Sequence, residues 1–304
     1  PLSLVVSSFA PVNDARLTLT PDLKHDPDGG VTGLVYVDLS QGVYPLGATA
    51  LSQVYGQLGD SHADSDATLL KKFFNAMQEI VKGGLALAYH DRSDGGLAVT
   101  LAEMAITGGR GVLAKLPDGD VLEQLFNEQP GAVLQVAEKN YQKVLEIFRK
   151  ARVPARLVGT CTQSSRSFKV WVGSRLALDT DLTELRRAWS ETTYRMQALR
   201  DNPESAKQEY DNGLDETDPG MNFRLTFDPD EKPSKAKGKV KAAPRMAILR
   251  EQGVNGHIEM AAAFALAGFD CQDVHMSDLI EGRVDLKDFQ GLVACGGFSY
   301  GDVL

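Results

Sequence analysis

The chain has 304 residues, a length that suits about two domains of roughly 150 residues each. Hydrophobic residues make up 43% of it and charged residues 24%, which is typical of folded soluble proteins and excludes a disordered chain. The net charge of −9 argues against broad nucleic-acid binding. It still permits a local anion site, because helix N-termini and bound cations supply positive field.

The three cysteines, Cys161, Cys271 and Cys295, show no C-x-x-C spacing. This argues against a disulfide framework or a zinc site and favours a reducing cytoplasm. No apolar stretch reaches the ~18 residues that span a bilayer, so no membrane partner is expected. The sequence starts inside an apolar, strand-like run and stops abruptly at Leu304. We therefore expect both ends to be cut from a longer polypeptide.

The first 215 residues or so alternate short apolar runs with helical patterns. Six runs rich in Val and Leu predict strands at 2–7, 31–39, 85–89, 132–137, 156–159 and 168–172. Four segments with apolar residues at 3.6 spacing predict helices at 49–58, 69–81, 97–107 and 139–151. This alternation predicts an α/β layered domain with a mixed sheet.

Residues 180–210 predict one or two further helices, with a break at Asn202-Pro203, because the residue before proline avoids helical geometry. Four residues are candidates for packing there: Trp189, Tyr194, Met196 and Leu199.

The composition shifts between residues 211 and 244. Residues 211–219 are acidic and loop-like, and residues 232–241 (KPSKAKGKVK) are basic and poor in apolar side chains. A basic run can be a nucleic-acid arm. Because this one lies between two segments that look folded, an exposed linker is the better interpretation.

The remaining sequence predicts a β-α-β unit. Strands are expected at 246–249, 269–274 and 291–295, with a turn at 253–256, a helix at 258–267 and a short connection at 276–279. Gly268 stands where a C-terminal helix cap is usual. The order predicts a parallel, doubly wound sheet, of which about 60 residues are too few for a complete core.

A His-Asp-Arg-Ser-Asp-Gly-Gly-Leu motif follows an apolar strand and opens a helix. Asp91 at the strand end can ligate a hard cation, and Mg²⁺ is favoured when phosphates share its shell. Ser93 or Asp94 can cap the helix. Gly95 and Gly96 let the backbone approach a phosphate at the helix N-terminus. The alternative is a capped turn with no ligand, since these are turn residues in any case.

A second glycine-rich segment, ACGGFSYGD at 294–302, lies beyond the carboxyl end of a predicted parallel strand, where ligands bind in open α/β sheets. Consecutive glycines such as Gly296 and Gly297 can aim backbone N–H groups at a developing oxyanion. A plain glycine-rich turn is the alternative. The segment is not a P-loop, because the Lys-Ser/Thr ending is missing.

None of the cysteines is expected to be a nucleophile. Cys295 ends a strand and should be buried, Cys161 should lie between two strands, and Cys271 should lie inside one. His257 and Glu259 resemble part of a Cys-His-Glu triad. They should share a helix, where residues two apart point to nearly opposite sides, so they cannot work together.

These segments carry a family resemblance. Residues 90–105 resemble the C-terminal half of the superfamily of aminoimidazole ribonucleotide (AIR) synthetase, selenophosphate synthetase and thiamine-monophosphate kinase. Four further segments make the resemblance more specific than the superfamily: 189–209, 249–260, 274–278 and 292–304. With them, the chain resembles the large, single-chain phosphoribosylformylglycinamidine synthases of purine biosynthesis, over nearly its whole length apart from the linker.

The resemblance implies three parts. Residues 1–215 would form an AIR-synthetase-like C-terminal α/β domain with a mixed sheet and a nucleotide half-site. Residues 216–243 would be the linker. Residues 244–304 would be the truncated first part of a class I glutamine amidotransferase domain, flavodoxin-like with a parallel doubly wound sheet.

The resemblance also implies an activity. The family is an ATP-dependent carbon–nitrogen ligase that converts formylglycinamide ribonucleotide, glutamine and ATP to formylglycinamidine ribonucleotide, glutamate, ADP and phosphate. The implied site residues are Asp91 for Mg²⁺, Ser93, Asp94, Gly95 and Gly96 for ATP or ADP, and Gly296, Gly297 and Phe298 for the oxyanion loop.

The implied machinery is incomplete. The nucleophilic cysteine and a His-x-Glu pair are expected after Leu304, and most of the working ATP site is expected before Pro1. The remaining segments of the same polypeptide are therefore the expected partners. The chain alone should be inactive, and its nucleotide should have a structural role.

Two alternatives stay open. The chain could be a non-catalytic nucleotide-binding or assembly module, or it could be another kinase or synthetase of the same superfamily. The glycine-rich third strand and the linker argue against the latter, because those relatives lack a fused glutaminase.

Overall fold

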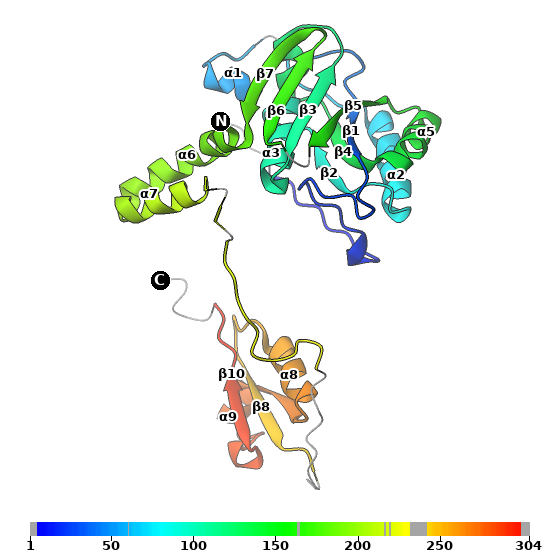
Figure 1. Ribbon diagram of the computed structural model, residues 1–304. Coiled ribbons are helices and arrows are strands. Elements are labelled where there is room, and N and C mark those ends of the chain that lie inside the picture. Colours follow the sequence, from blue (N-terminus) through cyan, green and yellow to red (C-terminus); the bar gives the residue numbers. More distant parts are fainter. Residues whose placement is uncertain are drawn as a thin grey trace. The chain divides into compact units, whose positions relative to one another are not determined.

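The computed structural model describes residues 5–59, 61–162, 165–215, 217–218, 220–231 and 242–298. The chain divides into two compact units, Pro1–Pro219 and Gly220–Leu304 (Figure 1).

Within its described residues, the first unit has a seven-stranded sheet of order β2-β4-β1-β5-β3-β6-β7. The strands are β1 (Thr32–Asp38), β2 (Ala88–Asp91), β3 (Gly111–Leu116), β4 (Gly131–Ala137), β5 (Ala155–Thr162), β6 (Ser167–Val172) and β7 (Arg175–Asp181). β3 and β6 pair in parallel, whereas the other neighbouring strands pair antiparallel. The predicted mixed sheet is confirmed.

Helices cover both faces of this sheet (Figure 1). The helices of this unit are η1 (Ala15–Leu17), α1 (Ala50–Val54), α2 (Ala67–Lys82), α3 (Gly96–Gly108), α4 (Val121–Phe126), η2 (Glu138–Asn140), α5 (Tyr141–Ala151), α6 (Leu182–Arg200) and α7 (Pro203–Asn212). Of these, α3 packs on one face of the sheet, and α2 and α5 pack on the other. Several of these helices have an aspartate as their N-cap residue. The Asp66 carboxylate, for example, accepts the N–H groups of Thr68 and Leu69 at the start of α2.

The central strand β1 explains why the sheet is covered on both sides. All seven of its residues are buried. Leu34 and Tyr36 belong to a hydrophobic cluster with α3, whereas Val35 and Val37 belong to a second cluster with α2 and α5. Because side chains alternate along a strand, one continuous apolar run supplies two cores.

Several predicted strands change in extent. Residues 5–7 form no strand, and residues 2–4 lie outside the described residues; Val5 is 91% exposed, so its apolar side chain gains no burial there. β2 begins at Ala88 rather than at residue 85, and β5 runs on to Thr162. β3 and β7 were not predicted.

The helices show similar differences. The helix predicted at 49–58 is limited to α1, and the chain then turns at Gly56, whose φ is 64°. α4 was not predicted. The break between α6 and α7 falls at Asn202, as predicted.

The packing predicted for α6 is wrong for three of its four residues. Trp189, Met196 and Leu199 are 64%, 67% and 91% exposed. Tyr194 is half-buried and stacks on Tyr210 of α7 with ring centroids 4.6 Å apart. The two helices therefore contact each other and leave the rest of this apolar surface open.

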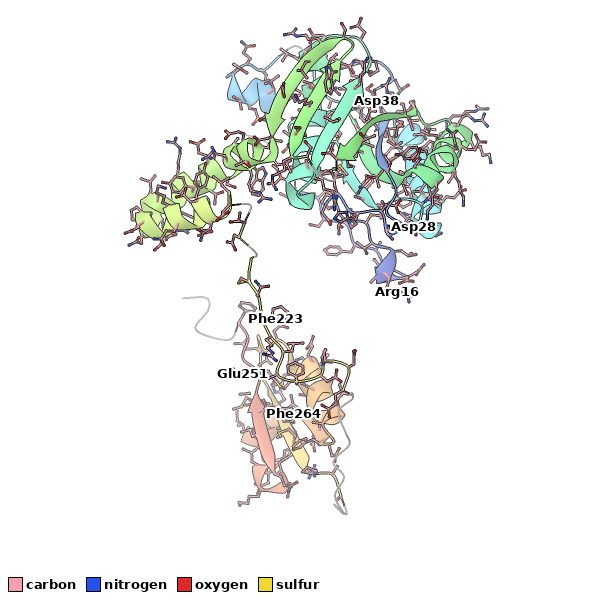
Figure 2. All side chains as sticks on the ribbon, viewed as in Figure 1. Arg16, Asp28, Asp38, Phe223, Glu251 and Phe264 are labelled. Atoms are coloured by element: carbon pink, nitrogen blue, oxygen red, sulfur yellow. The ribbon has the colours of Figure 1, made fainter. Side chains whose placement is uncertain are left out.

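The second unit contains, in its described part, a three-stranded sheet of order β10-β8-β9. Its elements are β8 (Arg245–Arg250), α8 (His257–Leu266), β9 (Asp270–His275), α9 (Met276–Ile280), η3 (Leu286–Asp288) and β10 (Gly291–Ala294). Both strand pairs are parallel. Gly268 follows α8 with a φ of 99°, and Phe264, labelled in Figure 2, meets Phe269 edge to face at 5.3 Å. The predicted parallel β-α-β unit is confirmed.

The segment between the units has no helix or strand in residues 217–218, 220–231 and 242–244. The basic run at 232–241 lies outside the described residues. Across the described ranges, each helix is too short or too polar to cross a membrane.

Candidate functional site

The motif at the end of β2 lines a cavity of about 390 Å³ in the first unit. Asp91, Ser93 and Asp94 lie on its wall. The other lining residues come from α2, β2, the start of β4 and the loops around them: Leu39, Ala63, Leu70, Phe73, Tyr89, Arg92, Glu128, Pro130 and Gly131. The cavity thus joins an apolar side, where Leu70 and Phe73 of α2 lie, to a side rich in carboxylates.

Asp91 ends β2 with its carboxylate directed to solvent, since the side chain is 62% exposed. Its Oδ1 lies 3.6 Å from Nδ1 of His90, and the other ring nitrogen of His90 lies 2.8 Å from Oε2 of Glu103 on α3. Burial, and then the negative charge of Asp91, raises the pKa of the neighbouring Tyr89 to about 12. Tyr89 is therefore neutral at physiological pH.

The turn from β2 into α3 differs from the prediction. Neither Ser93 nor Asp94 caps the helix; the N-cap is Gly95, in left-handed geometry with a φ of 82° and no side-chain cap. The N–H of Gly96 donates to the Ser93 carbonyl at 2.9 Å, and the N–H of Gly95 donates to Oε1 of Glu128 at 2.7 Å. Glycine tolerates this left-handed conformation, and the distant Glu128 carboxylate accepts the N–H of the N-cap residue itself.

Glu128 was missed by sequence reasoning. The same Oε1 also accepts the N–H of Ala50, the first residue of α1, at 2.8 Å. Glu128 lies 33 residues after Gly95. No local pattern marks it, because its position is set by the packing of α4 against α3.

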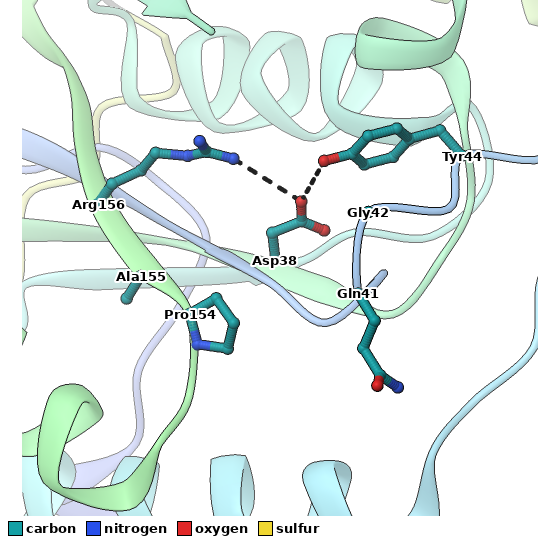
Figure 3. Close-up of a pocket in the computed structure, with 7 residues that line it drawn as sticks. All are labelled: Asp38, Gln41, Gly42, Tyr44, Pro154, Ala155 and Arg156. Carbon is teal, nitrogen blue, oxygen red and sulfur yellow. Dashed lines mark hydrogen bonds and ion pairs between the residues drawn. The ribbon is translucent and has the colours of Figure 1, made fainter.

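Asp38, at the end of β1, forms the floor of a neighbouring cavity of about 350 Å³ (Figure 3). One carboxylate oxygen, Oδ2, accepts the hydroxyl of Tyr44 at 3.0 Å and lies 3.8 Å from the half-exposed Arg156 guanidinium. The other, Oδ1, accepts the Ser40 N–H at 3.2 Å.

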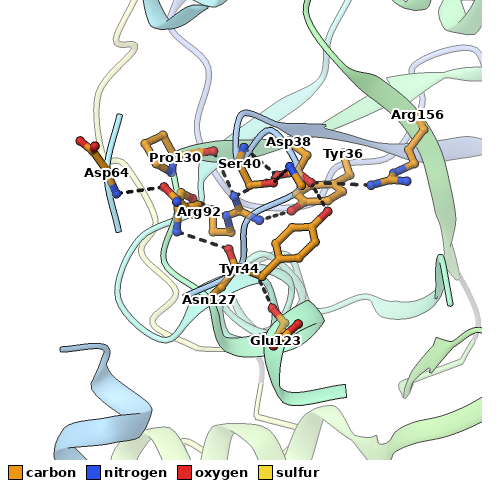
Figure 4. A network of polar contacts seen from close by, with 12 residues as sticks. Tyr36, Asp38, Ser40, Tyr44, Asp64, Arg92, Glu123, Asn127, Pro130 and Arg156 are labelled. Carbon is orange, nitrogen blue, oxygen red and sulfur yellow. Dashed lines mark hydrogen bonds and ion pairs between the residues drawn. The ribbon is translucent and has the colours of Figure 1, made fainter. Parts of the chain in front are cut away.

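Arg92, the third residue of the motif, points inward and joins this group (Figure 4). Its side chain is fully buried and donates to Asp38 Oδ1 and to the Pro130 carbonyl, both at 3.1 Å. It also donates to the Tyr36 hydroxyl and the Gln129 carbonyl. Burial raises the pKa of Tyr36, so its hydroxyl stays protonated. Arg92 therefore ties the motif to β1 rather than offering its charge to a ligand.

A metal site made by protein ligands alone is not present in the part of the chain that the structure describes, where no group of three or more His, Cys, Asp or Glu is placed to hold an ion. Asp91 still supplies one exposed, hard oxygen ligand. Mg²⁺ commonly binds through one or two carboxylates and takes its other ligands from phosphate and water. The donor set at Asp91 fits that mode.

In the second unit, Gly296 and Gly297 follow β10 with φ values of 69° and 146°. The Phe298 N–H donates to the Gly253 carbonyl at 2.8 Å, and the Asn255 N–H donates to the Gly296 carbonyl at 3.4 Å. The loop is therefore held against the turn before α8. The rest of the motif, from Ser299, lies outside the described residues.

The cysteines differ partly from their predicted surroundings. Cys295 follows β10 and is half-buried rather than buried, in keeping with β10, an edge strand of the described sheet whose residues are half-buried or exposed. Cys161 lies within β5, not between strands, and Cys271 lies within β9 as predicted. His257 and Glu259 share α8, as predicted.

Cys161 is expected to be the slowest of the three thiols to react with a disulfide reagent at pH 8. Burial of the thiol raises the pKa of Cys161 to about 11. Because the thiolate is the reactive form, roughly one molecule in a thousand would then be reactive at that pH. Reagent titration with the sites read by mass spectrometry checks this. Labelling of Cys161 ahead of Cys271 in the folded chain would contradict it.

Two protein families match the chain, one in each unit. Residues 39–172 match the C-terminal domain of AIR synthase related proteins. Residues 243–304 match the CobB/CobQ-like glutamine amidotransferase domain. Each unit thus resembles one kind of domain, the first an AIR-synthase-related domain and the second a glutamine amidotransferase domain. These matches confirm the predicted fold class, whereas the domain bounds at residues 215 and 244 stay predictions.

Solved structures show weaker likenesses. Thermotoga maritima PurL complexed with ATP is 19% identical over 56% of this chain and 27% of its own, with a TM-score of 0.43. PurLQS from Thermotoga maritima is 14% identical over 84% of this chain and 34% of its own, also at 0.43. HypE of E. coli, a hydrogenase maturation protein, is 17% identical over 50% of both chains, at 0.34. The chain thus spans about a third or less of the PurL structures.

Proposed function

We propose that the chain is part of a phosphoribosylformylglycinamidine synthase. This ligase uses ATP and glutamine to convert formylglycinamide ribonucleotide to formylglycinamidine ribonucleotide, with release of glutamate, ADP and phosphate. The observation that carries the proposal is the succession of an AIR-synthase-related domain and a glutamine amidotransferase domain in one chain. Such a fusion supplies both a nucleotide-using half and an ammonia-producing half. The three free cysteines favour a cytoplasmic enzyme.

The cavity beside Asp91 is proposed as a nucleotide half-site. Ser93 and Asp94 would line the phosphate side with Gly95 and Gly96 behind them, and Asp91 would ligate Mg²⁺. The exposed Asp91 carboxylate and the cavity volume of about 390 Å³ support this placement. Bound Mg²⁺ would neutralise phosphate charge there. The apolar wall from Leu70 and Phe73 could exclude water from one side of the ligand.

The loop of Gly296, Gly297 and Phe298 is proposed as the oxyanion loop of the glutaminase. Its place after a parallel strand supports this. The Phe298 N–H already donates to Gly253. If that N–H serves an oxyanion, the loop must first release it.

Replacing Asp91 with Asn is expected to weaken binding of Mg-nucleotide at this cavity at least about tenfold, because a carboxylate ligand becomes a neutral amide. Calorimetry on the full-length protein measures this. Asp179→Asn, on the exposed face of β7, is a control that should leave binding unchanged. Equal affinities for wild type and Asp91→Asn would remove Asp91 from the site.

The proposal that the chain is part of a glutamine-using ligase can be tested separately from the nucleotide site. The polypeptide beyond Leu304 should contain a G-x-C-x-G elbow and a later His-x-Glu pair, since the thioester chemistry of glutamine hydrolysis needs a cysteine and its base. The purified full-length enzyme should release ADP only when formylglycinamide ribonucleotide and an ammonia source are both present. Absence of the elbow and the pair would refute the amidotransferase assignment.

A further inference from the structure

The cavity beside the motif carries an excess of negative charge. Three carboxylates line it, those of Asp91, Asp94 and Glu128. Among its described lining residues the basic side chain is Arg92, and this guanidinium is fully buried and paired with Asp38. A polyphosphate adds several negative charges of its own. Coulomb repulsion therefore opposes its entry unless a cation accompanies it.

Glu128 also accepts two backbone N–H groups, one of them at the N-terminus of α3. Its Oε1 accepts the N–H of Gly95 at 2.7 Å and that of Ala50 at 2.8 Å. The N-terminal end of α3 would favour a phosphate, but a protein carboxylate already uses its first free N–H. A phosphate oxygen that reached Gly95 would have to displace Glu128.

We propose that Glu128 makes this cavity selective for cation-bound polyphosphates over the same polyphosphates without a cation. The inference rests on the nucleotide role proposed above and adds the residue that sets its selectivity. Two effects act in the same direction. The Glu128 charge repels a bare phosphate, and its oxygen keeps the Gly95 N–H engaged. Neutralisation of phosphate charge at Asp91 relieves the repulsion and leaves both hydrogen bonds to Glu128 in place.

The test compares ADP with Mg²⁺ and ADP with EDTA by calorimetry on the full-length protein. Binding that is lost in Asp91→Asn identifies the contribution of this cavity to Mg-ADP binding. Glu128→Gln keeps an acceptor oxygen and removes the charge. It is expected to raise the affinity for metal-free ADP about 2- to 30-fold, the span for one charge at a helix N-terminus, and to change Mg-ADP affinity less.

Glu128→Ala is the second variant, because it removes the acceptor as well as the charge. It should raise the affinity for metal-free ADP at least as much as Glu128→Gln. Glu123→Gln makes the same change of charge on an exposed residue of α4 that does not line the cavity. It should leave the ratio of the two affinities unchanged.

The outcomes separate this inference from the proposed function. If the Glu128 variants leave both affinities unchanged, or weaken both in the same proportion, Glu128 has a structural role and the inference is overturned. If wild type binds Mg-ADP with no contribution that Asp91→Asn removes, the nucleotide role itself fails. A rise confined to metal-free ADP supports both.

Discussion

Replacing Arg92 with Met is expected to lower the free energy of unfolding of the first unit by about 3–5 kcal/mol, the range for breaking one side of a buried ion pair. The fully buried guanidinium donates to Asp38 and Pro130 at 3.1 Å. Without it, the buried Asp38 carboxylate keeps Tyr44 and the half-exposed Arg156 as side-chain partners. Because these offset part of its charge, a loss near the lower end of the range is expected.

Urea denaturation followed by tryptophan fluorescence measures this loss in the 304-residue chain. The sequence has two tryptophans, Trp171 and Trp189, and both lie in the first unit, so the signal reports on that unit. Arg195→Met, from an exposed pair on α6, is the control and should change stability by less than about 0.5 kcal/mol.

The double variant Arg92→Met, Asp38→Asn tests whether the unpaired Asp38 charge causes the loss of stability. Removing the stranded charge should make the double variant more stable than the sum of the single losses predicts, by about 0.5–3 kcal/mol. A loss below about 1 kcal/mol in Arg92→Met alone would show that the pair is not a major support of the fold.

The sequence predicted those parts of the fold whose pattern is local. β1 is an unbroken apolar run, and α2 and α5 repeat apolar residues at helical spacing, so their types and places were clear. β7 was missed because it is an edge strand with charged residues at Arg175, Asp179 and Asp181 and little burial. α4 had a usable signal, since Asp120 caps it and Glu123 follows three residues later, but the helix is short.

The residues of the candidate site also fall into those that a local pattern predicts and those that only tertiary packing places. Asp91, Ser93 and Asp94 are contiguous with a strand end, and the structure places all three on one cavity wall. Glu128 and Asp38 reach the motif from far along the chain, through the pairing of β1 with β4 and the packing of α4. Propensity and spacing carry no information on such contacts. The inward direction of Arg92 depends on that same tertiary packing, and the motif alone did not indicate it.

Gly96→Ala is expected to destabilise the first unit by about 2–5 kcal/mol, the sum of a conformational and a steric cost. Gly96 has a φ of 66°, where a side chain costs about 1–2 kcal/mol. A Cβ there would also lie 2.7 Å from the carbonyl oxygens of Leu125 and Asn127, and overpacking of this kind adds about 1–3 kcal/mol. These are backbone atoms, so they cannot move aside without shifting the end of α4.

Gly109→Ala provides the matched control at the other end of the helix. Gly109 has nearly the same φ, 62°, but a Cβ there meets nothing within 4 Å. Its loss should therefore be the conformational cost alone, about 1–2 kcal/mol. Fluorescence-monitored urea denaturation of both variants isolates the steric part as their difference. Equal losses of stability in the two variants would mean that the end of α4 shifts to accommodate the Cβ at little cost. A larger loss in Gly96→Ala would show that α3 and α4 are rigidly joined, and that the position of Glu128 is built into the fold.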